Sequence, residues 1–287
     1  MSTDHASSWD VGSSRIDLAH PRVMGILNVT PDSFYDGGRF DSPDRAVAHA
    51  EKMVSEGADI IDVGGESSRP AGPYGKGAQT VSTEEEISRT APLIARIVRL
   101  LDVPISIDTT KTAVARAAVE AGATIVNDIS GVTQNPDTTR LLAEAKCGVV
   151  LMHMKGTPQS MQDNPTYDDV VSEVSSELGK AAVRCTDSGV DAGRIVVDPG
   201  FGFGKTRAHN LEILRRLWDF SKLGFPLLVG PSRKTFVDPN AAPEDRLAGS
   251  LAAASLAVAH GARIVRVHDV AETVRAVNLV QACLPPQ

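Results

Sequence analysis

Polar and charged side chains follow nearly every short apolar run of the sequence, which would gather acids, cations and amides at one site. The side chains are Asn28, Asp62, Glu66, Asp108, Asn127, Asp128, His153, Asp198, Ser232, Arg233, Lys234, Arg266 and His268. Carboxylates and amides accept hydrogen bonds from N–H groups of a ligand, whereas Arg, Lys and His bind anions. A single Asp or Asn after a strand is often a turn or capping residue. Stability gives no reason to collect this many charges, so the set indicates a binding site.

A glycine-rich segment, Gly200–Lys205, follows one of these runs. It is not a Walker A phosphate loop, because that motif needs a glycine where Pro199 stands, five positions before Gly204. The dinucleotide-binding spacing is also absent. We interpret the segment as a loop that brings its backbone and the ring of Phe203 close to a flat ligand. The alternative for Phe203 is ordinary core packing.

Eight apolar, β-branched runs precede these polar positions and are typical of buried strands. They are Val23–Leu27, Asp59–Val63, Ile105–Ile107, Thr124–Val126, Val149–Met152, Ile195–Val197, Leu227–Val229 and Ile264–Val267. Amphipathic stretches between them predict helices. Examples are Pro43–Glu56, Glu84–Leu101, Thr112–Ala121, Tyr167–Ser188, His209–Trp218 and Leu247–His260. Eight β-α units in one chain predict an α/β fold of the TIM (β/α)8 barrel type, with a doubly wound open sheet as the alternative.

Helix-end signals agree with this order of elements. Ser82, followed three residues later by Glu85, has the pattern of a capping box. Glycines stand where helix C-terminal glycines are expected, at Gly57, Gly122, Gly148 and Gly261.

No linker or composition break divides the chain, so we expect one barrel domain over residues 14–287 after a flexible extension over residues 1–13. Ser14–Leu18 is a candidate hairpin at the bottom of the barrel. The segments Thr30–Asp41 and Ser67–Val81 are long and rich in Gly and Pro. Long β-α loops of this kind often close over an active site, which in a TIM barrel lies at the C-terminal strand ends.

Composition excludes several classes of protein. The chain has 287 residues, of which 42% are hydrophobic, and a net charge of -7, which argues against a nucleic-acid-binding protein. Its three cysteines have no metal-binding or disulfide spacing. The first ten residues do not resemble a signal peptide, and no segment has the length and hydrophobicity of a membrane span. We therefore expect a cytoplasmic protein.

Seven strings at the strand ends resemble the dihydropteroate synthase family. They are Asn28–Phe34, Gly64–Pro70, Ser106–Lys111, Asn127–Gly131, Asp198–Lys205, Ser232–Lys234 and Arg266–Asp269. The resemblance runs from Arg22 to the C-terminal helix. It implies a TIM barrel, usually a homodimer. It also implies a transferase that joins 6-hydroxymethyl-7,8-dihydropterin diphosphate to 4-aminobenzoate, releasing pyrophosphate and 7,8-dihydropteroate for folate biosynthesis.

The resemblance implies a pterin pocket whose acceptors and donors match the ring. Arg266 would stack on the pterin face and also reach the diphosphate, as a guanidinium can and an ammonium cannot. The pterin-binding residues implied are Asp108, Asn127, Met152, Asp198, Phe203, Gly230, Lys234 and Arg266.

The resemblance also implies a diphosphate site at Asn28, Arg266 and His268, with Mg²⁺ held near Asn28. Magnesium uses few protein ligands, so the lack of a carboxylate cage is no objection. We expect a dissociative substitution, in which the leaving group departs before the amine attacks, and no general base, since an arylamine is nucleophilic when neutral. We interpret His153 as a core histidine. The catalytic residues implied are Asn28, Asp36, Lys234, Arg266 and His268.

The aminobenzoate site is implied at Phe34, Ser68, Arg69, Pro70 and Ser232, with Ser232 at a helix start. Four features depart from the common family pattern. Tyr35 and Ser68 replace other residues, the second loop is extended over residues 71–77, and the segment Phe236–Asn240 differs. These changes put sensitivity to sulfonamides in doubt.

Two rival functions remain open. A methyltetrahydrofolate:corrinoid methyltransferase shares the pterin pocket, but Asn28–Phe34 and Ser232–Lys234 argue against it. A catalytically silent pterin-binding paralogue has no support from any substituted site residue.

Overall fold

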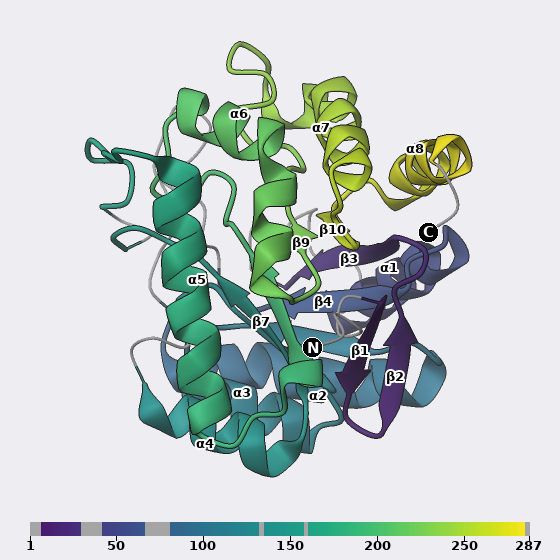
Figure 1. The fold of residues 1–287 in the computed structure, drawn as a ribbon. Coiled ribbons are helices and arrows are strands. Elements are labelled where there is room, and N and C mark those ends of the chain that lie inside the picture. The colour runs from purple at the N-terminus through teal and green to yellow at the C-terminus, as the bar shows by residue number, and fades with distance from the viewer. Residues whose placement is uncertain (1–6, 30–41, 67–80, 132–134, 158–159, 285–287) are drawn as a thin grey trace.

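Eight parallel strands form a closed barrel in the computed structural model, which describes residues 7–29, 42–66, 81–131, 135–157 and 160–284. The strands are hydrogen-bonded in the order β8-β7-β6-β5-β4-β3-β10-β9, and a bridge between Val197 and Leu227 joins the first to the last. The predicted TIM barrel is therefore confirmed, and the open-sheet alternative is wrong (Figure 1). The strands are β3 (Arg22–Asn28), β4 (Ile60–Gly64), β5 (Ile105–Asp108), β6 (Ile125–Asp128), β7 (Gly148–Met152), β8 (Ile195–Asp198), β9 (Leu228–Val229) and β10 (Ile264–Val267).

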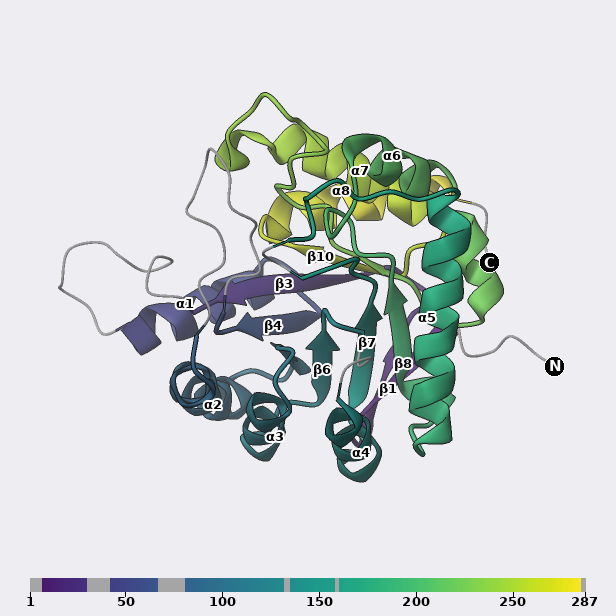
Figure 2. The ribbon, with the colours of Figure 1, turned by 90° about the vertical axis from the view of Figure 1, so that its left-hand side faces the viewer.

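Helices surround the strands in chain order (Figure 2). The α-helices are α1 (Ser42–Ser55), α2 (Thr83–Leu100), α3 (Thr112–Glu120), α4 (Pro136–Ala145), α5 (Val170–Asp187), α6 (Arg207–Arg215), α7 (Leu247–Ala259) and α8 (Val270–Cys283). Short 3-10 helices are η3 (Ala192–Arg194), η4 (Leu217–Leu223) and η5 (Pro243–Asp245). None of these described helices is long and apolar enough to cross a membrane.

The strands are buried on both faces, which explains their continuous apolar runs. Every residue of β4 is buried. Outward-facing residues such as Ile61 and Val63 belong to the large core beneath the helices. A smaller core fills the bottom of the barrel interior and contains Met24, Ile60 and eight further side chains from the strands, the hairpin and its exit.

The predicted helix ends are confirmed with one exception. The Ser82 side chain accepts a hydrogen bond from Glu85 N at 3.2 Å and caps α2. Gly57, Gly122 and Gly261 have φ values between 98° and 112°, which favour glycine after a helix. Gly148 was predicted wrongly: it begins β7, where a Cβ would lie 3.0 Å from the indole of Trp9.

A two-stranded hairpin closes the bottom of the barrel. Its strands are β1 (Ser8–Val11) and β2 (Ser14–Asp17), with Trp9 paired to Ile16. Trp9 is fully buried and donates from Nε1 to the carbonyl of Arg194 at 2.8 Å. The hairpin therefore begins earlier than the predicted Ser14–Leu18. The extension expected over residues 1–13 includes β1, and residues 1–6 lie outside the described part of the chain.

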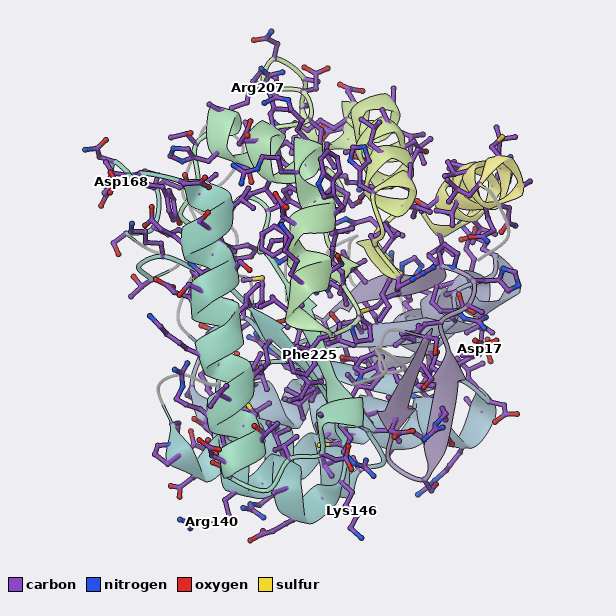
Figure 3. All side chains as sticks on the ribbon, in the orientation of Figure 1. Asp17, Arg140, Lys146, Asp168, Arg207 and Phe225 are labelled. Carbon is purple, nitrogen blue, oxygen red and sulfur yellow. The ribbon has the colours of Figure 1, made fainter. Side chains whose placement is uncertain are left out.

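The two ends of the barrel are separated in Figure 3. Asp168 and Arg207, which lie at the starts of α5 and α6, mark the end where the strands terminate. Lys146, which precedes β7, lies at the opposite end. The polar strand-end residues therefore belong to the face that carries the active site in TIM barrels.

Candidate active site

Arg266 lies at the centre of the strand ends and pairs with two carboxylates. Its Nε donates to Asp62 Oδ2 at 2.5 Å, and an Nη donates to Asp108 Oδ2 at 2.6 Å. Asn127 Nδ2 donates to the same oxygen of Asp62 at 3.1 Å. The strands β4, β5, β6 and β10 thus bring together four side chains that are far apart in the sequence. A guanidinium bonded through its edge leaves its faces available for stacking.

Burial dominates the electrostatics of this network. It raises the pKa of Asp108 to about 7, although the neighbouring Arg266 opposes the shift. Burial disfavours the charge on Arg266, but Asp62 and Asp108 together raise its pKa above the ordinary value. Asp62 is fully buried, and its Oδ1 has no hydrogen-bond partner among the described residues. The pocket therefore holds a fixed cation beside a carboxyl group that titrates near neutrality.

Lys234 and Asp198 lie on the other side of this group. The Asp198 carboxylate is buried and accepts from Gly200 N at 2.7 Å, and burial raises its pKa. Lys234 Nζ donates to the carbonyl of Phe201 and lies 4.2 Å from the centre of the Phe203 ring. Burial lowers the pKa of Lys234 to about 7, although Asp198 opposes the shift. The site thus offers an acceptor and a donor side by side.

Phe203 is half-exposed, whereas Phe201 is fully buried and stacks on Phe236 at 5.2 Å between ring centres. The core-packing alternative considered for Phe203 therefore applies to Phe201 instead. Met152 is buried at the end of β7, next to the turn that begins at Gly200.

Ser232 and His268 contact each other beside the network. Ser232 Oγ lies 3.1 Å from His268 Nδ1 and accepts from His268 N at 3.2 Å. The predicted helix start at Ser232 is wrong, because turns follow it and α7 begins only at Leu247. The turn is held instead by Arg233, which has a φ of 58° and makes a two-bond ion pair with Asp269 at 2.5 and 3.0 Å.

Glycines keep space open between the strand ends. A Cβ on Gly64 would lie 3.5 Å from Asn28 Oδ1 and 3.7 Å from Asp108 Cβ. A Cβ on Gly230 would lie 3.8 Å from Arg266 Cβ. Asn28 is half-buried at the end of β3 and presents an oxygen at this opening. No group of three or more His, Cys, Asp or Glu side chains suited to a metal ion occurs in the described part of the chain.

His153 is buried at the end of β7, as expected for a core histidine. Its Nδ1 lies 2.9 Å from Lys205 Nζ. Its Nε2 lies 2.9 Å from Glu177 Oε2 without a well-directed hydrogen bond. Burial, together with Lys205, lowers its pKa to about 3, so the ring is neutral.

Five predicted site residues lie outside the described residues: Phe34, Asp36, Ser68, Arg69 and Pro70. Their roles stay predictions. Neither Asp62 nor Lys205 has an assigned role in the predicted site. Asp62 could have been given one as an acidic side chain inside an apolar strand, and Lys205 as the cation that ends the glycine-rich segment.

Known proteins resemble the chain over nearly its full length. The model of the family described as "Pterin binding enzyme" matches residues 24–268. Dihydropteroate synthase of Escherichia coli K12 is 48% identical over 271 residues, covering 94% of each chain.

Solved structures agree with the sequence match. Xanthomonas albilineans dihydropteroate synthase with 4-aminobenzoic acid has a TM-score of 0.89 and 44% identity, covering 98% of this chain and 100% of that one. The same enzyme in complex with 7,8-dihydropteroate has a TM-score of 0.86 and 41% identity, covering 97% and 100%. The match of a family model to most of the chain, and of a relative to 94% of it, leads to one conclusion: the chain belongs to the dihydropteroate synthase family of pterin-binding enzymes.

Proposed function

We propose that this protein joins 6-hydroxymethyl-7,8-dihydropterin diphosphate to 4-aminobenzoate, giving 7,8-dihydropteroate and pyrophosphate. The observation that carries the proposal is the group of buried acceptors and cations at the strand ends, centred on Arg266. The relatives that match the chain also include complexes with the amine substrate and with the product.

The pterin ring binds between Asp198, Asp108, Asn127 and Lys234 in this proposal. The pterin amino and ring N–H groups donate to the carboxylates, and Lys234 donates to the ring carbonyl or a ring nitrogen. Arg266 stacks on the ring, because Asp62 and Asp108 hold its edge. Phe203, Met152 and Gly230 complete the walls of the pocket.

The diphosphate binds beside Asn28, Arg266 and His268. The amide oxygen of Asn28 is a hard donor of the kind that Mg²⁺ prefers, and the opening kept by Gly64 fits an ion that retains most of its water and phosphate ligands. Bound there, Mg²⁺ would neutralise charge on the phosphate oxygens. Asn28 would hold it, while Arg266 and His268 bind the diphosphate directly.

The bond between the pterin methylene and the diphosphate oxygen breaks, and pyrophosphate leaves with the electron pair. The amine of aminobenzoate forms the new C–N bond and then loses one proton to solvent. Arg266 and His268 stabilise the departing anion, and Asp36 is assigned to the developing cation. Neither His153 nor His268 acts as a base in this scheme, because an arylamine is nucleophilic when neutral. His153 is also held by its contacts with Lys205 and Glu177.

Aminobenzoate is assigned to Phe34, Ser68, Arg69, Pro70 and Ser232. Support within the described residues comes from Ser232, whose hydroxyl contacts His268 and so adjoins the diphosphate site. Ser232 and neighbouring N–H groups bind the carboxylate of aminobenzoate. These groups belong to a turn and not to the helix start expected from the sequence.

A homodimer in the cytoplasm is part of the proposal. Leu256 of α7 and Leu279 of α8 are 50% and 67% exposed on helices that pack together, which supports a covered face. Light scattering should give twice the chain mass.

Labelled product is the direct test. Purified protein, the pterin diphosphate, labelled aminobenzoate and Mg²⁺ should give labelled dihydropteroate, and EDTA should abolish it.

Asp198→Asn should weaken pterin binding by about 1 to 3 kcal/mol, because an amide presents donors to donors. Asp187→Asn, an exposed change at the end of α5, should have no effect. Pterin binding without product in the presence of Mg²⁺ would leave the silent-paralogue alternative.

A further inference from the structure

The turn over Gly200–Gly204 is bound by side chains at each of its five carbonyl groups. Lys205 Nζ donates to the carbonyls of Gly200 at 3.1 Å and Phe203 at 2.9 Å. The remaining carbonyls, those of Phe201, Gly202 and Gly204, accept in turn from Lys234, from Gln162 at 2.6 Å and from the Tyr167 hydroxyl at 2.8 Å. Such complete occupation fixes where the turn presents its backbone.

Lys205 is the most enclosed of these donors. It is 2% exposed, and besides the two carbonyls its ammonium contacts His153 Nδ1 at 2.9 Å. The ammonium also lies 3.4 Å from the His153 carbonyl, so its three protons have four acceptors, two from the turn and two from the residue that follows β7. His153 suits this place because it is neutral and accepts at Nδ1.

The turn packs closely on the segment that follows β7. A Cβ on Gly200 would lie 2.0 Å from the carbonyl oxygen of His153, and one on Gly204 would lie 2.3 Å from that of Lys155. Both glycines have positive φ, so larger residues are excluded by conformation as well. Lys205 joins the two backbone segments at this contact, since it donates to the carbonyl of Gly200 at 3.1 Å and to that of His153 at 3.4 Å.

The Gly200–Gly204 turn contacts Asp198 and Lys234, the residues proposed to bind the pterin edge. Gly200 N donates to Asp198, and the Phe201 carbonyl and Phe203 ring contact Lys234. A Cβ on Gly202 would lie 3.1 Å from Lys234 Cδ, so the lysine stem lies directly on the turn. A shift of the turn therefore moves both the acceptor and the donor.

We infer that Lys205 is a positioning residue for the pterin pocket, whose ammonium closes the Gly200–Gly204 turn against His153 and so places Asp198 and Lys234. It does not touch substrate. The inference rests on the proposed function, because it assumes that Asp198 and Lys234 bind the pterin. Burying a cation among neutral acceptors costs free energy, and burial lowers the pKa of Lys205 to about 7, which fits a role in function better than one in stability alone.

Lys205→Met tests the inference, because methionine keeps much of the stem and removes all three donors. The KM for the pterin diphosphate should rise about tenfold or more, while the KM for aminobenzoate stays within about twofold. Affinity for 6-hydroxymethylpterin, measured by calorimetry, should fall by the same factor as the first KM rises. Lys180→Met is the matched control, because Lys180 is an exposed lysine of α5 that makes none of the contacts described for the turn. It should change neither KM by more than about twofold.

Tyr167→Phe gives a second, milder variant that removes only the hydroxyl bonded to the Gly204 carbonyl. It should weaken hydroxymethylpterin binding selectively by about threefold. If Lys205→Met does not fold by circular dichroism, unchanged pterin affinity in Tyr167→Phe overturns the inference. Equal rises in both KM values for Lys205→Met, or no rise, overturn it directly. A wild-type protein without affinity for hydroxymethylpterin overturns the proposed function and the inference together, whereas wild-type affinity retained in Lys205→Met overturns the inference alone.

Discussion

At the scale of single residues, the pocket combines two groups whose pKa values are displaced toward each other. Burial raises the pKa of Asp108 and lowers that of Lys234, each to about 7. Arg266 stays charged between them because Asp62 and Asp108 compensate its burial. Neutral pH is therefore the condition under which acceptor and donor coexist.

Pterin affinity should consequently peak near pH 7. Below it, Asp108 gains a proton and stops accepting; above it, Lys234 loses the proton that it donates. Calorimetry with 6-hydroxymethylpterin between pH 5 and 9 should show affinity falling in both directions by about tenfold for each pH unit far from the peak.

Variants separate the two limbs of this profile. Asp108→Asn should make the acid limb shallower, with the remainder due to Asp198, whose pKa burial also raises. Lys234→Met should make the alkaline limb shallower, with the remainder due to Lys205, whose pKa burial also lowers to about 7. The same ligand in all three proteins cancels titration of the pterin itself. An alkaline limb of unchanged slope in Lys234→Met would remove that lysine from the pocket.

Single residues were predictable from sequence where a motif carried them and not where only packing did. Asp108, Asn127 and Arg266 follow strands and were expected to converge, as they do. The pairing of Asp62 with Arg266 joins residues 204 positions apart, and no local pattern encodes it. The sequence assigns no role to Lys205 beyond its place at the end of the glycine-rich loop, because the carbonyls that it bonds become neighbours only after folding.

At the scale of elements, one ion cluster ties together the ends of the long β4–α2 loop. Lys111, at the start of α3, donates to Glu66 at 2.5 Å, to Glu86 at 2.6 Å and to the carbonyl of Val81 at 2.7 Å. Glu66 follows β4, Val81 precedes α2, and Glu86 is 1% exposed in its first turn. The lysine thus joins three elements through a buried carboxylate.

Lys111→Met should destabilise the fold by about 3 kcal/mol, because it leaves the Glu86 carboxylate buried without a cation. Urea unfolding at pH 7 measures the loss. The double variant Lys111→Met/Glu86→Gln should recover most of it, since the buried charge is then gone. A double variant as unstable as Lys111→Met would show that the ion pair is not the cause.

Elements were more predictable than the connections between them. Strands buried on both faces read as apolar runs, so all eight were located within one or two residues. The prediction of a helix start at Ser232 is wrong, although a strand end followed by Ser and Lys resembles one. Arg233 has a left-handed backbone conformation and pairs with Asp269, so the chain forms a turn there. The local sequence indicates a helix end at Gly148, because it does not show that this glycine contacts Trp9 in the folded chain.

At the scale of the whole molecule, the candidate active site and the hairpin that closes the barrel lie at opposite ends. The strand ends carry the charged network, and the opposite end is sealed by the β1–β2 hairpin. Trp9 fills that end: it is fully buried, packs with Val11 and Ile125, and bonds to the Arg194 carbonyl. A Cβ at position 148 would lie 2.8 Å from Val11 Cγ1 and 3.0 Å from the Trp9 indole, so packing of the hairpin requires glycine there. Stability and catalysis should therefore respond to different substitutions.

Trp9→Ala should lower the free energy of unfolding by about 3 to 5 kcal/mol, since it empties a large buried volume and leaves the Arg194 carbonyl without its donor. Both KM values and kcat should stay within about twofold of wild type at a temperature where the variant is folded, because the cavity lies at the end of the barrel remote from the site. The other tryptophan supplies the control: Trp218 is 51% exposed, so Trp218→Ala should cost about 1 kcal/mol or less. Urea unfolding and steady-state kinetics on the three proteins decide the matter. A Trp9→Ala enzyme that unfolds normally but loses pterin affinity would show that the two ends of the barrel are coupled.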